Sequence, residues 1–189
     1  MKKLLSFLRG ISTLLVISSC ANLPSTNIAQ IYTPLNNQGM VIGALSFKNE
    51  KPIFNAYSLF YTGENITDLS IKNRIYITPE QMVKMKFKPD FFDNEKAVYY
   101  FSITEKEGQY TFSSFSVFMN GGYIQKNGSV PINIPFKIEK NKVLYIGEIY
   151  VDYNKNKIIL VDKKDRDIPR LKAKYPNLKI EYLPIILIK

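Results

Sequence analysis

The stretch Ala97-Val98-Tyr99-Tyr100-Phe101-Ser102-Ile103 carries an apolar side chain at every second position. This period of two is that of a β-strand with one face in a core, because successive side chains of a strand point to opposite faces. The same alternation, or a dense run of aromatic and β-branched residues, occurs in residues 41–47, 54–61, 71–78, 110–119, 132–138, 142–153, 157–162 and 178–188. Eight or nine short strands predict a mainly β chain folded as an antiparallel β-sandwich or barrel, of which we favour the sandwich.

Proline and glycine predict where strands end or lie at an edge. Pro131 and Pro135 have no N–H to donate to a neighbouring strand, so their strand is expected at the edge of a sheet. Gly121-Gly122 and Asn127-Gly128 are typical turn sequences, and Asn154-Lys155-Asn156 is another.

One short helix is expected near the end of the chain. Asp165 or Asp167 can accept hydrogen bonds from the free amides at its start, and Pro169 fits its first turn. Pro176 then ends it, so the expected helix covers Ile168–Tyr175.

Residues 1–20 have the pattern of an export signal. Lys2, Lys3 and Arg9 precede the apolar run Ile11–Ile17, and small residues follow it. The apolar run is too short to span a bilayer of about 30 Å. The ending Ile17-Ser18-Ser19-Cys20 resembles the lipobox of bacterial lipoproteins, which implies cleavage before Cys20 and acylation of Cys20.

This resemblance predicts the organisation of the chain and its location. Residues 1–19 would be a lipoprotein signal peptide, residues 20–38 a lipidated cysteine with a flexible polar tether, and residues 39–189 a single β-sandwich domain. Ala21, rather than Asp, after the cysteine resembles the sorting signal for the outer membrane. We therefore expect a bacterial envelope lipoprotein, attached to the outer membrane through acylated Cys20 and facing the periplasm or the cell surface.

The composition argues against an enzyme. The chain has no His and no Trp, and Cys20 is its only cysteine. These absences exclude nucleophilic catalysis with an imidazole base and ordinary zinc sites of His and Cys. We expect no catalytic residues, no metal and no cofactor, and a hydrolase based on carboxylates is a less favoured alternative.

The formal net charge of +10 attracts anions of many kinds. For an exported protein these would be lipid head groups, acidic glycan or an acidic partner, and nucleic acid is not expected. A net charge that serves only solubility is the preferred interpretation.

Five cations are candidates for an anion-binding surface. Lys84, Lys86 and Lys88 alternate with apolar residues after a turn expected near Pro79. A hairpin with residues 71–78 would place these three lysines on one face together with Lys72 and Arg74. A solvated face, or edge lysines that prevent aggregation, is the preferred interpretation. A helix that begins at Pro79 is a further alternative, and in it Lys86 would point away from the other two lysines.

Carboxylates give two weaker signals. Asp162, Asp165 and Asp167 lie close enough in sequence to hold calcium, but helix capping and ion pairs are the preferred interpretation because basic residues interleave with them. Glu148 stands in an apolar run, between Ile146 and Tyr150 on its expected face. Its burial would be costly unless a Lys or Arg meets it, and such a group can also mark a functional site.

Three segments of the second half resemble a group of uncharacterised bacterial lipoproteins with a transthyretin-like, or prealbumin-like, β-sandwich. They are Glu107–Tyr110, Lys142–Ile149 and Leu171–Leu178. The resemblance implies an antiparallel sandwich of transthyretin-like or immunoglobulin-like type, with one short helix near the C-terminus and no catalytic residues.

These observations favour a protein that works by binding. The leading hypothesis is a lipid-anchored adaptor or structural module with a protein partner in the envelope. The alternative is a binder of anionic lipid or glycan through the basic strand face. An exposed apolar patch would favour the first hypothesis, and a salt-sensitive interaction would favour the second.

We expect Cys20→Ser to release the protein from the membrane or to leave an uncleaved precursor. The reason is that acyl chains stabilise membrane attachment by about 0.8 kcal/mol per buried methylene. Cell fractionation followed by detection of the chain tests this. Processed protein that still sediments with membranes after the substitution would contradict it.

Overall fold

The computed structural model describes residues 28–35, 37–48, 54–66, 73–79, 88–120, 123–152, 155 and 157–182. Within these ranges the chain forms ten β-strands and one α-helix. The elements are β1 (Gln38–Phe47), β2 (Ala56–Gly63), β3 (Arg74–Ile77), β4 (Phe91–Asp93), β5 (Lys96–Lys106), β6 (Gly108–Asn120), β7 (Gln125–Ile138), β8 (Val143–Asp152), β9 (Lys157–Val161), α2 (Lys164–Lys174) and β10 (Ile180–Tyr182).

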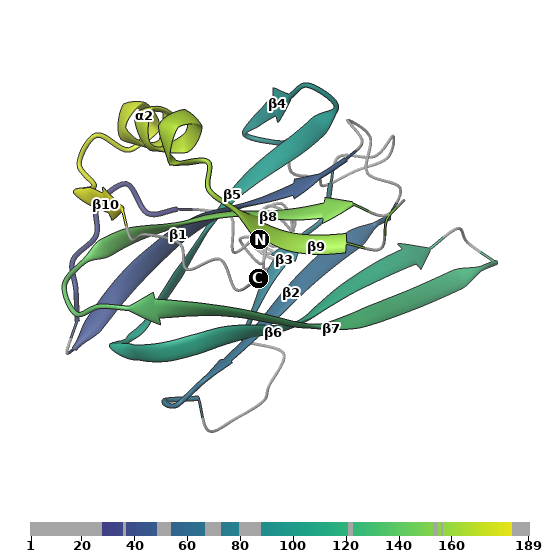
Figure 1. Cartoon of the computed structure of the whole chain (residues 1–189), viewed down its shortest axis with the longest axis horizontal. Helices are drawn as coiled ribbons and strands as arrows, with labels where there is room; N and C mark the ends of the chain where they lie inside the picture. Colours follow the sequence, from purple (N-terminus) through teal and green to yellow (C-terminus); the bar gives the residue numbers. More distant parts are fainter. Residues whose placement is uncertain are drawn as a thin grey trace, which may run out of the picture.

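The strands form two sheets that face each other, as Figure 1 shows. Sheet A has six strands in the order β10-β8-β1-β5-β4, with β9 also paired to β8. Sheet B has four strands in the order β3-β2-β6-β7. The helix α2 lies on the face of sheet A that is turned away from sheet B. The mainly β prediction, with two sheets and a helix near the end of the chain, is therefore confirmed.

The alternation expected from the sequence sorts the side chains of sheet A onto two buried faces. The face toward sheet B contributes, from β1 and β5, the residues Val41, Leu45, Phe47, Ala97, Tyr99, Phe101 and Ile103. The opposite face contributes Ile42, Ala44, Val98, Tyr100 and Tyr145, which pack with Leu171 and Tyr175 at the end of α2. Because both of its faces are covered, sheet A forms the centre of the molecule, and each fully buried large apolar side chain stabilises it by about 1.5–3 kcal/mol.

The expectation of a purely antiparallel sandwich is wrong for sheet A. Sheet B is antiparallel throughout, but β8 runs parallel to β1 and β10 runs parallel to β8. An alternating pattern identifies the two faces of a strand and contains no information on its direction. Sheet A is therefore mixed.

Edges and turns agree only in part with the sequence expectations. The strand with Pro131 and Pro135 is β7, and it lies at the edge of sheet B as predicted. The turn predicted at Asn127-Gly128 is wrong, because both residues are extended within β7 and pair with β6. Gly121-Gly122 lies outside the described residues.

The strand β4 was not expected from the sequence. It forms a hairpin with β5 through Asn94 and Glu95. Asn94 has a φ of 53° there, in the left-handed region that Asn adopts more easily than most residues.

The helix begins earlier than predicted, at Lys164 instead of Ile168, so Pro169 lies in its second turn instead of its first. Neither predicted aspartate caps it. Asp162 Oδ1 accepts the backbone N–H of Lys164 at 3.0 Å, whereas Asp167 is fully buried against sheet A. With this start, Asp167 and Leu171 lie four residues apart on the same face of the helix, and both are buried.

Part of the expected tether packs on the domain. Ile28 is 3% exposed and lies in the core between α2 and sheet A, with Tyr32 packed against the same cluster. The signal peptide and Cys20 lie outside the described residues. No stretch of helix in the described ranges combines the length and apolar composition that crossing a bilayer requires.

We expect Gly43→Ala to lower the free energy of unfolding by about 1–3 kcal/mol, the cost of overfilling a packed core. A Cβ at Gly43 would lie 2.5 Å from Cζ of Phe101, whose ring is fully buried. Gly128→Ala is the control, because its Cβ would meet a side-chain methyl of Val117 at 3.2 Å in an exposed part of β7. Urea unfolding compares the two, and equal effects would contradict the prediction.

Candidate functional site

The strongest concentration of charge lies between α2 and sheet A. Arg166 extends from the helix and donates to three carboxylates, and we call Arg166, Glu148, Asp167 and Asp93 the buried charge cluster. The guanidinium contacts Asp93 Oδ2 at 2.7 Å and Asp167 at 2.7 Å and 2.9 Å, and it also donates to Glu148. Glu148 and Asp167 have no exposed surface. The expectation that a basic residue would meet Glu148 is confirmed.

The remaining carboxylate oxygens of this cluster are also occupied. Ser46 Oγ donates to Glu148 at 2.7 Å, and Lys96 lies 4.0 Å from the same oxygen. Asp167 accepts hydrogen bonds from the hydroxyls of Tyr100, at 3.0 Å, and Tyr145. Glu148 and Asp167 are therefore buried with hydrogen-bond partners on both of their carboxylate oxygens, the arrangement that a buried charge requires.

Burial and charge interactions shift the pKa values of Arg166 and Asp93 in the buried charge cluster, and of the two tyrosines beside it. Burial raises the pKa of the Tyr100 and Tyr145 hydroxyls, and the negative charge of Asp167 raises both further. Burial lowers the pKa of Arg166, but its hydrogen bonds and charge interactions with Asp167 and Glu148 outweigh burial and raise it. Burial raises the pKa of Asp93. The hydrogen bond and the positive charge of Arg166 outweigh burial, so the pKa of Asp93 lies below its ordinary value.

Glu148 faces the helix because of Gly147. Gly147 has a φ of 99°, which side chains rarely permit, and the register between β1 and β8 shifts at this point. As a result, Ile146 points into the core between the sheets while Glu148 points to the opposite face of sheet A. The expectation that Ile146 and Glu148 share a face is therefore wrong.

The three aspartates considered for calcium do not converge. Asp162 accepts the hydroxyl of Tyr182 at 2.7 Å and pairs with Lys164, Asp165 is exposed, and Asp167 belongs to the buried charge cluster. Ion pairing therefore accounts for Asp162 and Asp167. Among the described residues, no group of three acidic or sulfur side chains is arranged to hold a metal ion.

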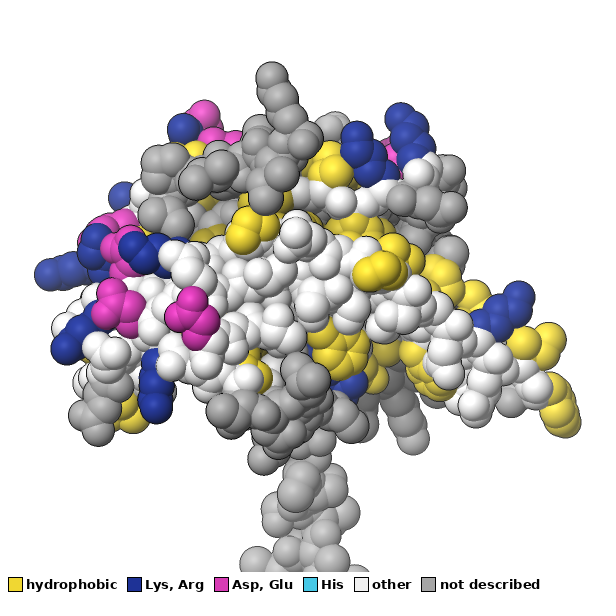
Figure 2. Space-filling view, turned by 60° about the horizontal axis from the view of Figure 1, so that its bottom comes forward, with side chains coloured by type: hydrophobic (Ala, Val, Ile, Leu, Met, Phe, Trp, Pro, Cys, Tyr) yellow, Lys and Arg dark blue, Asp and Glu magenta, His cyan; other side chains and the backbone are white. Residues whose placement is uncertain are grey.

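The far end of the β6–β7 hairpin, beyond the pairing of β6 with β2, projects from the sandwich (Figure 1), and we call its described residues 119–120 and 123–131 the arm. Residues 123–131 are all exposed, so the first half of β7 packs on no other layer. Tyr123 is fully exposed, Ile124 is 61% exposed and Val130 is 51% exposed. Figure 2 shows hydrophobic side chains at this free end.

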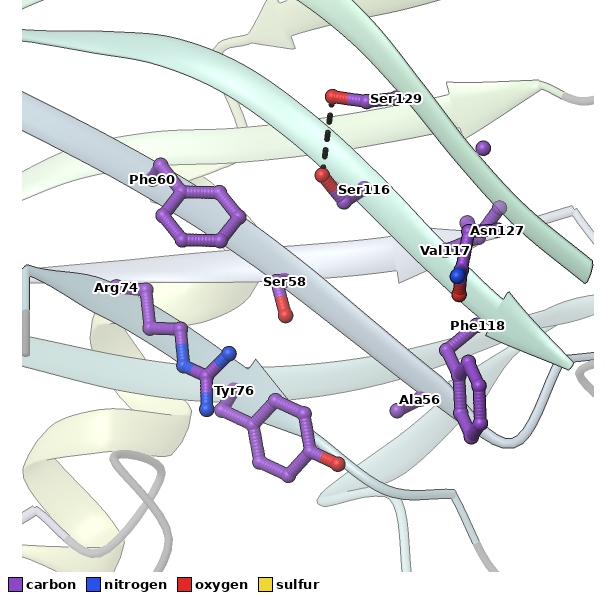
Figure 3. A pocket seen from close by; sticks show the side chains of 11 residues that line it. Ala56, Ser58, Phe60, Arg74, Tyr76, Ser116, Val117, Phe118, Asn127 and Ser129 are labelled. Atoms are coloured by element: carbon purple, nitrogen blue, oxygen red, sulfur yellow. Dashed lines mark hydrogen bonds between the residues drawn. The ribbon is translucent and has the colours of Figure 1, made fainter. Parts of the chain in front are cut away.

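The outer face of sheet B carries a groove of about 480 Å³, shown in Figure 3. One row of residues crosses all four strands on this face, from Tyr76 through Ser58 and Ser116 to Ser129. The small side chains of this row form the floor. Aromatic residues rise at both ends, Phe60 and Tyr76 at one and Phe118 at the other. We call this feature the sheet B groove.

Arg74 stands at one end of the sheet B groove. Its guanidinium carbon lies 4.6 Å from the ring centre of Tyr76 and 6.0 Å from that of Phe60. Arg74 makes no ion pair with a carboxylate of the described residues. The guanidinium therefore contacts two aromatic rings, and the side chains of the neighbouring groove floor carry no charge.

The other cations of the expected anion-binding surface are described only in part. Lys88 is exposed and precedes β4 of sheet A, whereas Arg74 belongs to β3 of sheet B. Lys72, Lys84 and Lys86 lie outside the described residues, as does the lipidation site Cys20. The hairpin that would bring the five cations together stays a prediction.

Known proteins show little similarity to this chain. No model of a protein family matches the chain, and no curated protein matches it. A leucine-rich repeat protein of known structure from Bacteroides thetaiotaomicron is similar over 61% of this chain, with 13% sequence identity and a TM-score of 0.34. The chain spans 14% of the length of that protein. A similarity this weak supports no conclusion on function.

We expect Arg166→Met to lower the free energy of unfolding by about 3–5 kcal/mol at neutral pH, because it leaves buried carboxylates without their cation. Arg170→Met is the matched control on the same helix. Arg170 is exposed and stacks on Phe91 at 4.4 Å, and the loss of such a contact costs about 0.5–1 kcal/mol.

The effect of Arg166→Met depends on pH. The lowered pKa of Asp93 stabilises the native protein above the unfolded pKa of about 3.9, and this contribution is lost as the pH falls through the folded value. The difference between wild type and variant is therefore expected to narrow below about pH 4. Urea unfolding at several pH values measures it. A variant as stable as wild type at pH 7 would show that the cluster is dispensable.

Proposed function

We propose that this chain is a lipid-anchored lipoprotein of the bacterial envelope that binds a protein partner through its arm. The attachment rests on the sequence of residues 1–20, where a short apolar run ends in Cys20. Ala21 supports the outer membrane as the location. We further propose that the two-sheet fold is a variant of the transthyretin-like sandwich, in which β1 and β8 of sheet A run parallel.

The exposed end of the arm is the observation that carries the proposed binding function. Tyr123 and Ile124 expose apolar surface side by side at the free end of the arm, and Val130 exposes more apolar surface farther along β7, opposite Phe115. Large exposed apolar side chains gathered at one place are typical of surfaces that meet another protein. Tyr is also enriched among the residues that dominate binding energies.

The backbone of the arm supports the same proposal. The strand β7 is the edge of sheet B, so Gln125–Val130 has one side open to a further strand. Pro131 and Pro135 limit such pairing to the segment before them, because proline cannot donate to it. A two-stranded ribbon on its own is only marginally stable in water, and a partner strand added to this edge would stabilise it.

The buried charge cluster supports binding over catalysis. Glu148 and Asp167 are occupied by Arg166, Ser46 and two tyrosines, so the proposed protein has no free pair of carboxylates there. The alternative of an anionic glycan or lipid ligand is supported by a separate observation, the charge of Arg74 in the sheet B groove.

We expect a photo-crosslinking amino acid at Tyr123 to form an adduct with a second protein in intact cells. The same amino acid at Lys172, an exposed position on α2, is the control and is expected to form none. Mass spectrometry of the adduct identifies the partner and the residue attached. The double variant Ile124→Ser and Val130→Ser is expected to reduce the adduct about tenfold, since each residue buries apolar surface at roughly 25 cal/mol per Å².

Two outcomes would contradict this proposal. One is an adduct at Lys172 as abundant as the adduct at Tyr123, which would indicate random collision. The other is an adduct at Tyr123 that contains lipid and no protein, which would assign the arm to the membrane.

A further inference from the structure

We propose that the sheet B groove binds an acidic sugar unit of a glycan, with the sugar carboxylate on Arg74 and the sugar ring over the serine floor. This inference concerns the outer face of sheet B, where the groove shares Asn127, Gly128 and Ser129 with the arm, and it does not depend on a protein partner at the free end of the arm. It assigns a ligand class to a site for which the comparisons offer none.

The first argument is the charge of Arg74. A guanidinium presents two parallel N–H donors that match the two oxygens of a carboxylate. Within the described ranges Arg74 has no carboxylate partner, and it is half-buried between Phe60 and Tyr76. A half-buried cation without an anionic partner among the described residues is complementary to an anionic ligand.

The second argument is the floor of the groove. Ser58, Ser116 and Ser129 lie in one line across three strands, and each hydroxyl can both donate and accept. Ser116 donates to Ser129 at 3.0 Å, which leaves further acceptor positions on both oxygens. Asn127 adds an amide at the far end. Such a row of uncharged polar groups suits the hydroxyls of a sugar.

The third argument is the aromatic boundary. Phe60, Tyr76 and Phe118 line the groove, and the apolar C–H face of a sugar ring packs well on an aromatic face. A volume of about 480 Å³ lies within the range of roughly 300–1,000 Å³ typical of small-ligand sites. The groove is therefore large enough for one or two sugar units.

The single cation narrows the class of ligand. Among the described residues that line the groove, Arg74 is the only charged side chain. Ligands rich in phosphate, such as nucleic acids, are held by several cations. One guanidinium beside hydroxyls and aromatic rings fits a sugar with one carboxylate better than it fits a phosphate cluster.

The test is calorimetric titration of the full chain, purified in detergent micelles, with a disaccharide of uronic acid. The matched probe is the same disaccharide with its carboxylates esterified, and inorganic phosphate and vesicles of anionic phospholipid are the competing anions. We expect the acidic disaccharide to bind. We expect the dissociation constant of the ester to be higher by about tenfold or more, the typical effect of losing a hydrogen bond to a charged group.

Three variants assign the binding to the sheet B groove. Arg74→Gln is expected to raise the dissociation constant about tenfold or more, because it removes the charge. Ser129→Leu, at an exposed position of β7, is expected to weaken binding by filling the floor. Lys157→Gln removes one charge from exposed β9 of sheet A and is expected to leave binding unchanged. Thermal unfolding of each variant confirms that the fold is retained.

Several results would overturn the inference. Equal affinity for the acid and its ester would remove the role of the carboxylate, and unchanged binding by Arg74→Gln would remove the role of Arg74. No binding of the acidic disaccharide at millimolar concentration would exclude it as a ligand. Displacement of the sugar by phosphate, or stronger binding to anionic vesicles, would assign the groove to a phosphate headgroup.

Discussion

The guanidinium of Arg166 holds together three parts of the chain that are distant in sequence. It joins α2 to Glu148 on β8 and to Asp93 at the end of β4, and it holds Asp167 in the orientation that the two tyrosines require. A buried carboxylate without a partner costs several kcal/mol, even after the surrounding structure relaxes. The covered outer face of sheet A therefore depends on this one side chain, and Gly147 is the residue that turns Glu148 toward it.

The two sheets differ in what they expose. Sheet A lies between sheet B and α2 and buries both of its faces, whereas sheet B buries one face and, within the described ranges, has no layer packed on the other. Both proposed binding surfaces, the arm and the sheet B groove, belong to sheet B. The buried charge cluster and α2 cover one side of sheet A with packed side chains and ion pairs, and both proposed binding surfaces lie on sheet B, away from this side.

The sequence predicted the parts of this structure that follow from local chemistry. Alternation gave both faces of β1 and β5, and the prolines gave the edge position of β7. The sequence did not predict the direction of β8, because pairing between strands about a hundred residues apart leaves no local pattern. Arg166 was missed for the same reason, since its partners lie on β4 and β8. Asn127-Gly128 was misread as a turn because an exposed edge strand tolerates turn residues.

The central place of β1 has a consequence for how the chain folds. This strand precedes the other strands of sheet A in the described chain, yet its partners are residues 97–106 and 143–151. Its two edges are therefore completed by segments that are far apart in the chain. Non-local pairing of this kind is slow and leaves an unpaired strand prone to aggregation. A chain truncated before β8 would pair β1 with β5 on one side and leave the other edge of β1 open to a strand from another molecule.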